Sequence, residues 1–150
     1  HEEQMRQAGI NCELSLPPPE QTAIAADRRL SFQACRNVCV NALQILAGSV
    51  KKDLRIAIEA VGQERLRLTV RDSGPGIRPE HLPQLFDVFF TTRKGGVGFG
   101  LAITRKIVEE HGGTISAANN PDSMGAVFTI ELPRQSPIGQ ARPPAAARLK

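Results

Sequence analysis

The sequence predicts an α/β fold, a two-layer α/β sandwich in which helices cover one face of a mixed sheet. Two long segments show the 3.6-residue apolar period of a helix, at 28–47 and at about 98–111. Four shorter segments alternate apolar and polar residues as the strands of two hairpins do, at 53–60, 65–72, 114–118 and 126–132. Because such strands carry one apolar face, the sheet needs a layer of helices against that face.

The composition is that of one ordinary folded domain. The chain has 150 residues, with 41% hydrophobic and 23% charged, and a domain commonly spans roughly 100–200 residues. No apolar run approaches the roughly 20 residues that cross a bilayer, and residues 1–20 lack the order of a signal peptide. We therefore expect a cytoplasmic domain without membrane contact, whether or not its parent protein is membrane-anchored.

The net charge of +4 comes from the end of the chain. Residues 1–133 carry equal numbers of cations and anions, and the excess lies in Arg134, Arg142, Arg148 and Lys150. These cations stand among prolines and alanines, which predicts a disordered basic tail over 134–150 behind a domain of residues 1–133. Without a basic, aromatic-rich face on the domain, no nucleic-acid binding is expected.

The first part of the chain predicts strands followed by a long helix. Residues 11–16 and 21–26 flank the turn-forming Pro17–Pro19 and are expected to form two short strands. Asp27 is expected to cap a helix that begins at Arg28 and ends at Ala47, where Gly48 and Ser49 stop it.

The rest of the chain predicts hairpin, loop, helix and hairpin. The first hairpin turns at Gly62-Gln63, and the second turns over 119–122. Between them, residues 73–98 are rich in Gly and Pro and contain three phenylalanines. A connection of that length in one domain usually belongs to a binding site.

The first helix has an unusual face made of amides. Gln33, Asn37, Asn41 and Gln44 fall within about 80° of one another on a helical wheel. A solvent-facing helix normally carries charges, so this stripe suggests a polar surface with its own partners. On this feature alone, an ordinary solvent-exposed helix without a binding role is an equally good explanation.

Two glycine-rich segments could hold a nucleotide. The segment Asp72-Ser73-Gly74-Pro75-Gly76 ends a strand, where the glycines permit close approach and the carboxylate can accept from an exocyclic amine such as that of adenine. The segment from Gly95 to Leu101 opens the second helix, whose backbone amides can hold phosphate. Each signal is weak alone, and neither fits a Rossmann or Walker A site. The order of amide helix, first glycine segment, Phe-rich loop and second glycine segment is specific.

With these motifs in this order, the chain resembles the catalytic domain of a two-component sensor histidine kinase over about 27–133. That superfamily, with its Bergerat ATP-binding fold, includes gyrase, heat-shock chaperones and mismatch-repair proteins. The matching motifs are the N box at 37–42, the first glycine box at 72–76, the F box at 86–90 and the second glycine box at 96–100. The segments 89–93 and 125–133 are most similar to the nitrogen-regulation and dicarboxylate-sensing branch.

The resemblance implies ATP and Mg²⁺ as cofactors and assigns roles to individual residues. Asn41 would bind Mg²⁺ and Asn37 would support the phosphates. Asp72 would bind the adenine amine, with Thr129 helping through water and Gly74 and Gly76 allowing the base to approach. The lid over the triphosphate would comprise Gly96, Gly98, Gly100 and Leu101, and Arg93 or Lys94 would neutralise the γ-phosphate.

The resemblance also implies partners outside the motifs. The phosphoacceptor histidine would lie on an upstream dimerisation domain, because His1 lacks the helix and the proline that surround such a residue. The parent would be a homodimer that signals to a response regulator. The alternatives are an ATPase of the gyrase or chaperone kind, a serine-directed kinase module, and a non-catalytic nucleotide-sensing domain. The ATPases have a glutamate where this chain has Asn37, and an amide cannot act as a base toward water.

Overall fold

The computed structural model describes residues 2–18, 21, 24, 26–92 and 95–134. In this part of the chain one sheet has five strands: β1 (Asn11–Ser15), β2 (Asp53–Val61), β3 (Arg65–Asp72), β4 (Thr114–Asn119) and β5 (Ala126–Pro133). Their order is β1-β2-β3-β5-β4, with β1 parallel to β2 and the other neighbours antiparallel. The predicted mixed sheet and both predicted hairpins are confirmed.

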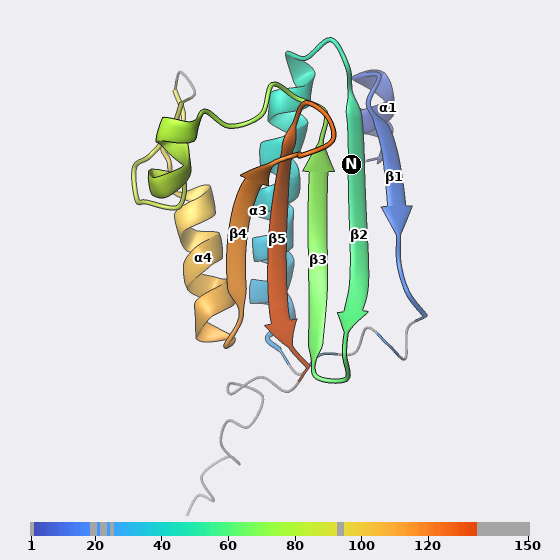
Figure 1. Ribbon diagram of the computed structural model, residues 1–150, viewed down its shortest axis with the longest axis vertical. Helices are drawn as coiled ribbons and strands as arrows, with labels where there is room; N and C mark the ends of the chain where they lie inside the picture. The colour runs from blue at the N-terminus through green and yellow to red at the C-terminus, as the bar shows by residue number, and fades with distance from the viewer. Residues whose placement is uncertain (1, 19–20, 22–23, 25, 93–94, 135–150) are drawn as a thin grey trace, which may run out of the picture.

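Two long helices, α3 (Arg28–Ala47) and α4 (Gly100–Glu110), cover one face of this sheet, and Figure 1 shows α3 running behind the strands. The buried stripe of α3 consists of Ala34, Val38, Ala42 and Leu46. It joins one core with Ile107 and Val108 of α4 and with the buried strand residues Leu54, Val70, Phe128 and Ile130. The fold is therefore the expected two-layer α/β sandwich.

The ends of the two helices are tied together. Asp27 Oδ1 accepts hydrogen bonds from the Arg29 and Leu30 N–H groups, each at 2.9 Å, which confirms the predicted N-cap of α3. The buried His111, just beyond α4, has Nδ1 2.7 Å from the Ile107 carbonyl oxygen, and its Nε2 accepts from the Asp27 N–H at 3.2 Å. This imidazole fixes the start of α3 against the end of α4.

The two faces of the sheet have different chemistry. Even-numbered residues of β3 and β5, such as Val70 and Phe128, are buried beneath the helices. The odd-numbered residues lie on the other face, where Arg67 pairs with Glu59 and Glu131. The core of the described residues therefore lies on the helix side of the sheet.

Some elements differ from the expectation. The short helices α1 (Glu2–Gln7) and η1 (Pro79–Gln84) were not predicted, and α4 begins at Gly100 rather than at Gly98. The strand predicted over 21–26 is wrong, since none of its described residues is in a strand. That segment has one large apolar side chain, Ile24. A single such side chain buries too little apolar surface to stabilise a strand against the core.

Three predictions fall on residues that the structure does not describe, and one of them is the role of Arg93 or Lys94. The others concern His1 and the predicted tail apart from Arg134, whose N–H donates to the Glu64 carbonyl at 2.7 Å. Among the described helices, none has both the length and the apolar character that crossing a membrane requires.

Candidate active site

A cleft of about 1080 Å³ opens between α3, the loop after β3, η1 and the start of α4. This volume is at the upper end for small-molecule sites, which range over roughly 300–1,000 Å³. The cleft brings together residues from all four predicted motifs: Asn37, Asn41, Gly76, Phe90, Gly96, Gly98, Gly100 and Leu101. Segments far apart in the sequence therefore converge on one site.

The amide face of α3 forms one wall. Asn37, Asn41 and Gln44 line the cleft, whereas Gln33 is exposed and does not. Asn37 Nδ2 donates to the Gly100 carbonyl at 3.1 Å and to Thr104 Oγ1 at 3.2 Å. Asn37, one of the amides of this face, is therefore hydrogen-bonded to the start of α4.

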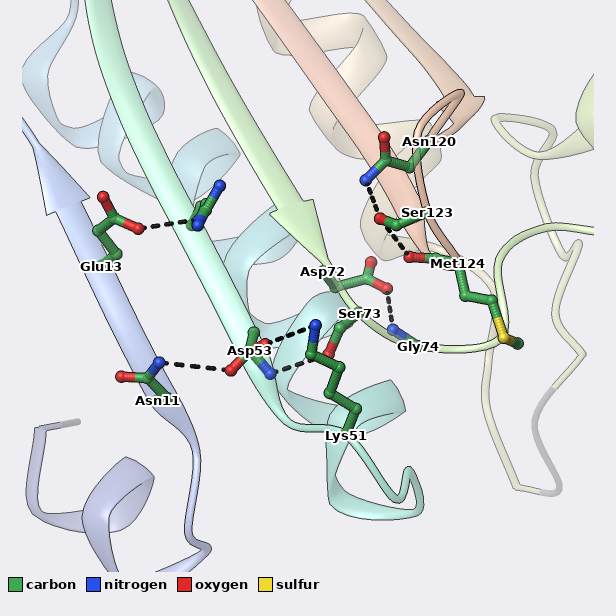
Figure 2. A network of polar contacts seen from close by, with 11 residues as sticks. Asn11, Glu13, Lys51, Asp53, Asp72, Ser73, Gly74, Asn120, Ser123 and Met124 are labelled. Atoms are coloured by element: carbon green, nitrogen blue, oxygen red, sulfur yellow. Dashed lines mark hydrogen bonds and ion pairs between the residues drawn. The ribbon is translucent and has the colours of Figure 1, made fainter.

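Asp72 and Gly74 are buried and do not line the cleft. Asp72 lines a smaller hollow of about 290 Å³ instead, together with Lys51 and Arg71. Asp72 is 3% exposed, and a Cβ on Gly74 would lie 2.6 Å from the side chain of Ile45, which does line the cleft. Asp72 Oδ1 accepts from the Gly74 N–H at 2.8 Å (Figure 2) and from the Ala126 N–H at 3.3 Å. Asp72 Oδ2 is buried and accepts no hydrogen bond from any described residue. A buried carboxylate oxygen without a donor fits an amine on a ligand.

The environment of Asp72 also changes its acidity. Burial raises the pKa of the Asp72 carboxyl, and the hydrogen bonds from the Gly74 and Ala126 N–H groups oppose this in part. The folded state thus holds this proton at a higher pH than the unfolded chain does. As the pH rises from the pKa of Asp72 in the unfolded chain to its higher pKa in the folded state, this carboxyl lowers the free energy of unfolding.

The glycine-rich lid is fastened to the Phe-rich loop. Gly98 has φ of +73°, and a Cβ there would lie 2.5 Å from the Phe89 carbonyl carbon, so only glycine fits. The Gly98 carbonyl accepts from the Phe89 N–H at 3.2 Å, and the Phe89 and Phe99 rings are 4.9 Å apart. Phe89 itself has φ of +69°. Arg93 and Lys94, which precede the lid, lie outside the described residues.

Thr129 does not reach the cleft. Its neighbours on β5, Phe128 and Ile130, are buried beneath the helices, so Thr129 points to the opposite face of the sheet. The expectation that Thr129 helps to bind the adenine amine through water is therefore wrong. The β5 residue next to the Asp72 carboxylate is Ala126.

Sequence reasoning missed several residues that line the cleft. Arg78 and His81 come from the loop after the first glycine segment, and Phe128 comes from β5. The His81 ring packs against the Phe90 ring at 5.4 Å between centroids. The available signal was the long loop itself, because these contacts depend on how the loop packs around the cleft.

The donor set fits a magnesium ion held largely by phosphates. Among the described residues, no three His, Cys, Asp or Glu side chains are grouped as metal ligands. Mg²⁺ in nucleotide sites keeps several waters and takes one or two protein oxygens besides the phosphates. The amide oxygen of Asn41 at the cleft wall can supply one of them.

We expect Thr104→Val to loosen the connection between α3 and the lid. Thr104 is fully buried, and its hydroxyl donates to the Gly100 carbonyl at 2.8 Å while accepting from Asn37. Losing these bonds with little change in shape should lower the free energy of unfolding by about 1 kcal/mol and weaken ATP binding several-fold. Urea unfolding and calorimetric titration would measure both. Thr104→Ser, which keeps the hydroxyl, should retain ATP affinity, although the loss of its buried methyl lowers the free energy of unfolding by about 1 kcal/mol.

We also expect ATP affinity to fall on acidification through the raised pKa of Asp72. On the expectation that Asp72 binds the adenine amine, the carboxylate is the form that accepts its hydrogen bond well, and the protonated form is a poorer acceptor. Calorimetric titrations over a pH series would show the loss. Inosine triphosphate carries the same phosphates without the amine, so parallel loss for both nucleotides would contradict this role of Asp72.

The chain matches a family of known proteins and several solved structures. Residues 26–136 match the family described as histidine kinase-, DNA gyrase B- and HSP90-like ATPase. The sensor protein FixL of Bradyrhizobium diazoefficiens is 35% identical over 85% of this chain and 25% of its own length. The nitrogen regulation protein NtrY of Azorhizobium caulinodans is 36% identical over 80% of this chain and 16% of its own length. The chain thus spans a quarter or less of these relatives.

The structural matches are of the same kind. The catalytic domain of histidine kinase ThkA superposes with a TM-score of 0.77 and 32% identity, over 89% of this chain and 86% of that one. Full-length ShkA, solved in complex with AMPPNP, gives a TM-score of 0.74 and 27% identity over 89% of this chain and 28% of that one. The chain belongs to the histidine kinase-, DNA gyrase B- and HSP90-like ATPase family, and its relatives are sensor histidine kinases.

Proposed function

We propose that the chain is a kinase catalytic domain that binds ATP with Mg²⁺ in the cleft and transfers the γ-phosphoryl group to a histidine on a separate dimerisation domain. The buried Asp72 Oδ2 supports adenine recognition, since it accepts no hydrogen bond from any described residue. The amide wall and the lid glycines support phosphate and metal binding. The ShkA complex with AMPPNP, an ATP analogue, agrees with a nucleotide in this fold.

Each element has a role in this proposal. The start of α4 presents backbone N–H groups to the phosphates, and Asn37 holds that helix end in place through the Gly100 carbonyl. The amide oxygen of Asn41 would hold Mg²⁺, which would supply positive charge against the triphosphate. Arg93 or Lys94 would supply positive charge at the γ-phosphate. Gly76 would let the base lie against the backbone.

The described cleft lining lacks acidic side chains, and this favours phosphoryl transfer over ATP hydrolysis. Among the described residues that line it, none is Asp or Glu. Efficient hydrolysis needs a base beside the attacking water, which in the related ATPases is a glutamate. The imidazole in the described lining, that of His81, packs against the Phe90 ring. An incoming histidine needs no such base, because its neutral imidazole nitrogen attacks the γ-phosphorus while ADP leaves.

The partners of the domain follow from the same proposal. A dimerisation domain of the parent protein would carry the phosphoacceptor histidine and make the parent a homodimer. A response regulator would then receive the phosphoryl group, and a structure of ThkA in complex with the response regulator TrrA agrees with such an assembly. Residues 1–133 would form the ATP-binding domain, with 134–150 as its tail.

The test is transfer of radioactive phosphate from labelled ATP. We expect the chain to label the parent's dimerisation domain while hydrolysing ATP slowly on its own, and the label should be acid-labile and alkali-stable. Rapid hydrolysis without transfer would instead favour the clamp ATPases. An acid-stable label would favour a serine kinase, and ATP binding with neither reaction would favour a nucleotide sensor.

A further inference from the structure

The β4–β5 hairpin forms hydrogen bonds with both ends of the loop that carries the first glycine segment. Asn119 and Ala126 are directly paired in the register of β4 and β5. The Ala126 N–H donates to Asp72 Oδ1 at 3.3 Å, at the start of the loop. At its end, Asn119 Oδ1 accepts from the Ile77 N–H at 2.6 Å, and Asn119 Nδ2 donates to the Ile77 carbonyl at 2.8 Å. One cross-strand pair therefore holds loop residues 72–77 at two points.

The hairpin and the loop are also in close steric contact. A Cβ on Gly76, whose φ is +83°, would lie 2.8 Å from Asn119 Oδ1. A Cβ on Gly125 would lie 1.8 Å from the Asp72 carbonyl oxygen. Figure 2 shows the hairpin turn, with Asn120, Ser123 and Met124, beside Asp72 and Gly74. The loop backbone therefore packs directly against the hairpin backbone at Gly125 and against the Asn119 side chain at Gly76.

The hydrogen bond from Ala126 and those of Asn119 hold different parts of the loop: the first holds a buried residue, and the others hold a residue that lines the cleft. Ala126 helps to hold the carboxylate of Asp72, which is buried. Asn119 holds Ile77, which lines the cleft together with Gly76. The distance between the carboxylate and this part of the cleft wall is therefore set by the Asn119–Ala126 pair.

We propose that Asn119 is a positioning residue for recognition of the nucleotide base. It acts through Gly76 and Ile77, holding the wall against which the base lies at the separation that lets the exocyclic amine meet Asp72. Asn119 is itself exposed and absent from the cleft lining. The inference rests on the proposed ATP-binding function and adds a determinant of base specificity to it.

The contacts of Asn119 point to this role rather than to general stability. Among the described residues, the Asn119 side chain forms two hydrogen bonds, and both go to the backbone of Ile77 rather than to the core. A side-chain amide that donates and accepts on the same peptide segment fixes both the position and the orientation of that segment. Its loss should move the wall while the sheet and helices remain in place.

The chain offers a matched control in the next residue. Asn120 lies in the same turn, but its side chain donates to Ser123 Oγ at 2.7 Å and accepts from the Asp122 N–H at 3.2 Å. Neither bond reaches the loop over 72–77. Asn120→Ala therefore disturbs the turn without releasing Ile77.

The experiment compares ATP with inosine triphosphate, which lacks the exocyclic amine, in calorimetric titrations of Asn119→Ala, Asn120→Ala and the unaltered chain. Removing two hydrogen bonds from the wall should weaken ATP binding about tenfold. Binding of inosine triphosphate should weaken less, so that discrimination between the two nucleotides falls. Asn120→Ala should preserve that discrimination.

A second variant keeps the test decisive if Asn119→Ala does not fold. Asn119→Asp retains the acceptor for the Ile77 N–H but lacks the donor to the Ile77 carbonyl, and it too should reduce discrimination. Equal weakening of both nucleotides, or no change in either, would overturn the role of Asn119 alone. Failure of the unaltered chain to bind ATP would overturn the proposed function, and the inference with it.

Discussion

Asp72→Asn is expected to abolish ATP binding, with affinity reduced by on the order of 100-fold or more, while the fold is retained. The Gly74 and Ala126 N–H groups both donate to Oδ1. An asparagine would therefore keep its oxygen at that position. Its Nδ2 would then replace Oδ2 and present N–H groups to the adenine amine, so donor would face donor.

Calorimetric titration with ATP, together with thermal unfolding, measures this effect. Asp53→Asn is the matched control, because Asp53 lies near the same end of the sheet but bonds to Lys51 and Asn11 outside the cleft. The control should bind ATP as the unaltered chain does. Normal ATP affinity in folded Asp72→Asn would remove Asp72 from the site.

Asn41→Ala is expected to uncouple nucleotide binding from magnesium. The substitution removes the one protein oxygen that we assign to the ion, so affinity for Mg-ATP should fall at least tenfold, the order seen when metal sites lose a supporting group. Binding of ADP without metal should change less. The rate of phosphoryl transfer should fall by on the order of 100-fold, because the ion offsets charge in the transition state.

Titrations with and without Mg²⁺ separate these effects. Gln33→Ala is a suitable control, since Gln33 is an exposed amide on the same helix that does not line the cleft. It should leave both affinities unchanged. Persistence of the magnesium dependence in Asn41→Ala would mean that other groups hold the metal.

Local patterns were sufficient to predict most of the fold. The helix α3 begins and ends where the Asp27 cap and Gly48 place it, because both signals act within one turn of the helix. The strands β2 to β5 follow from alternation, since one face of each is buried. The parallel pairing of β1 with β2 depends on contacts distant in the sequence, and α1 is too short and polar to show a helical period.

The candidate site was predictable where a residue type is required by the backbone or by chemistry. Gly76 and Gly98 have positive φ and no room for a side chain, and Asp72 is a carboxylate at the end of a strand. Thr129 was assigned to the site by resemblance, although the apolar alternation of Phe128, Ile130 and Leu132 already places it on the other face. The contributions of Arg78, His81 and Asn119 arise only when the loop folds against its neighbours, so no local pattern marks them.

The most direct measurement is an experimental structure of the chain with Mg²⁺ and a non-hydrolysable ATP analogue. The account predicts the adenine amine within about 3 Å of Asp72 Oδ2, the base against Gly76, the metal on Asn41 and the phosphates beneath the lid glycines. A nucleotide bound in the smaller hollow beside Lys51 and Arg71, or one whose base leaves Asp72 Oδ2 without a donor, would contradict it.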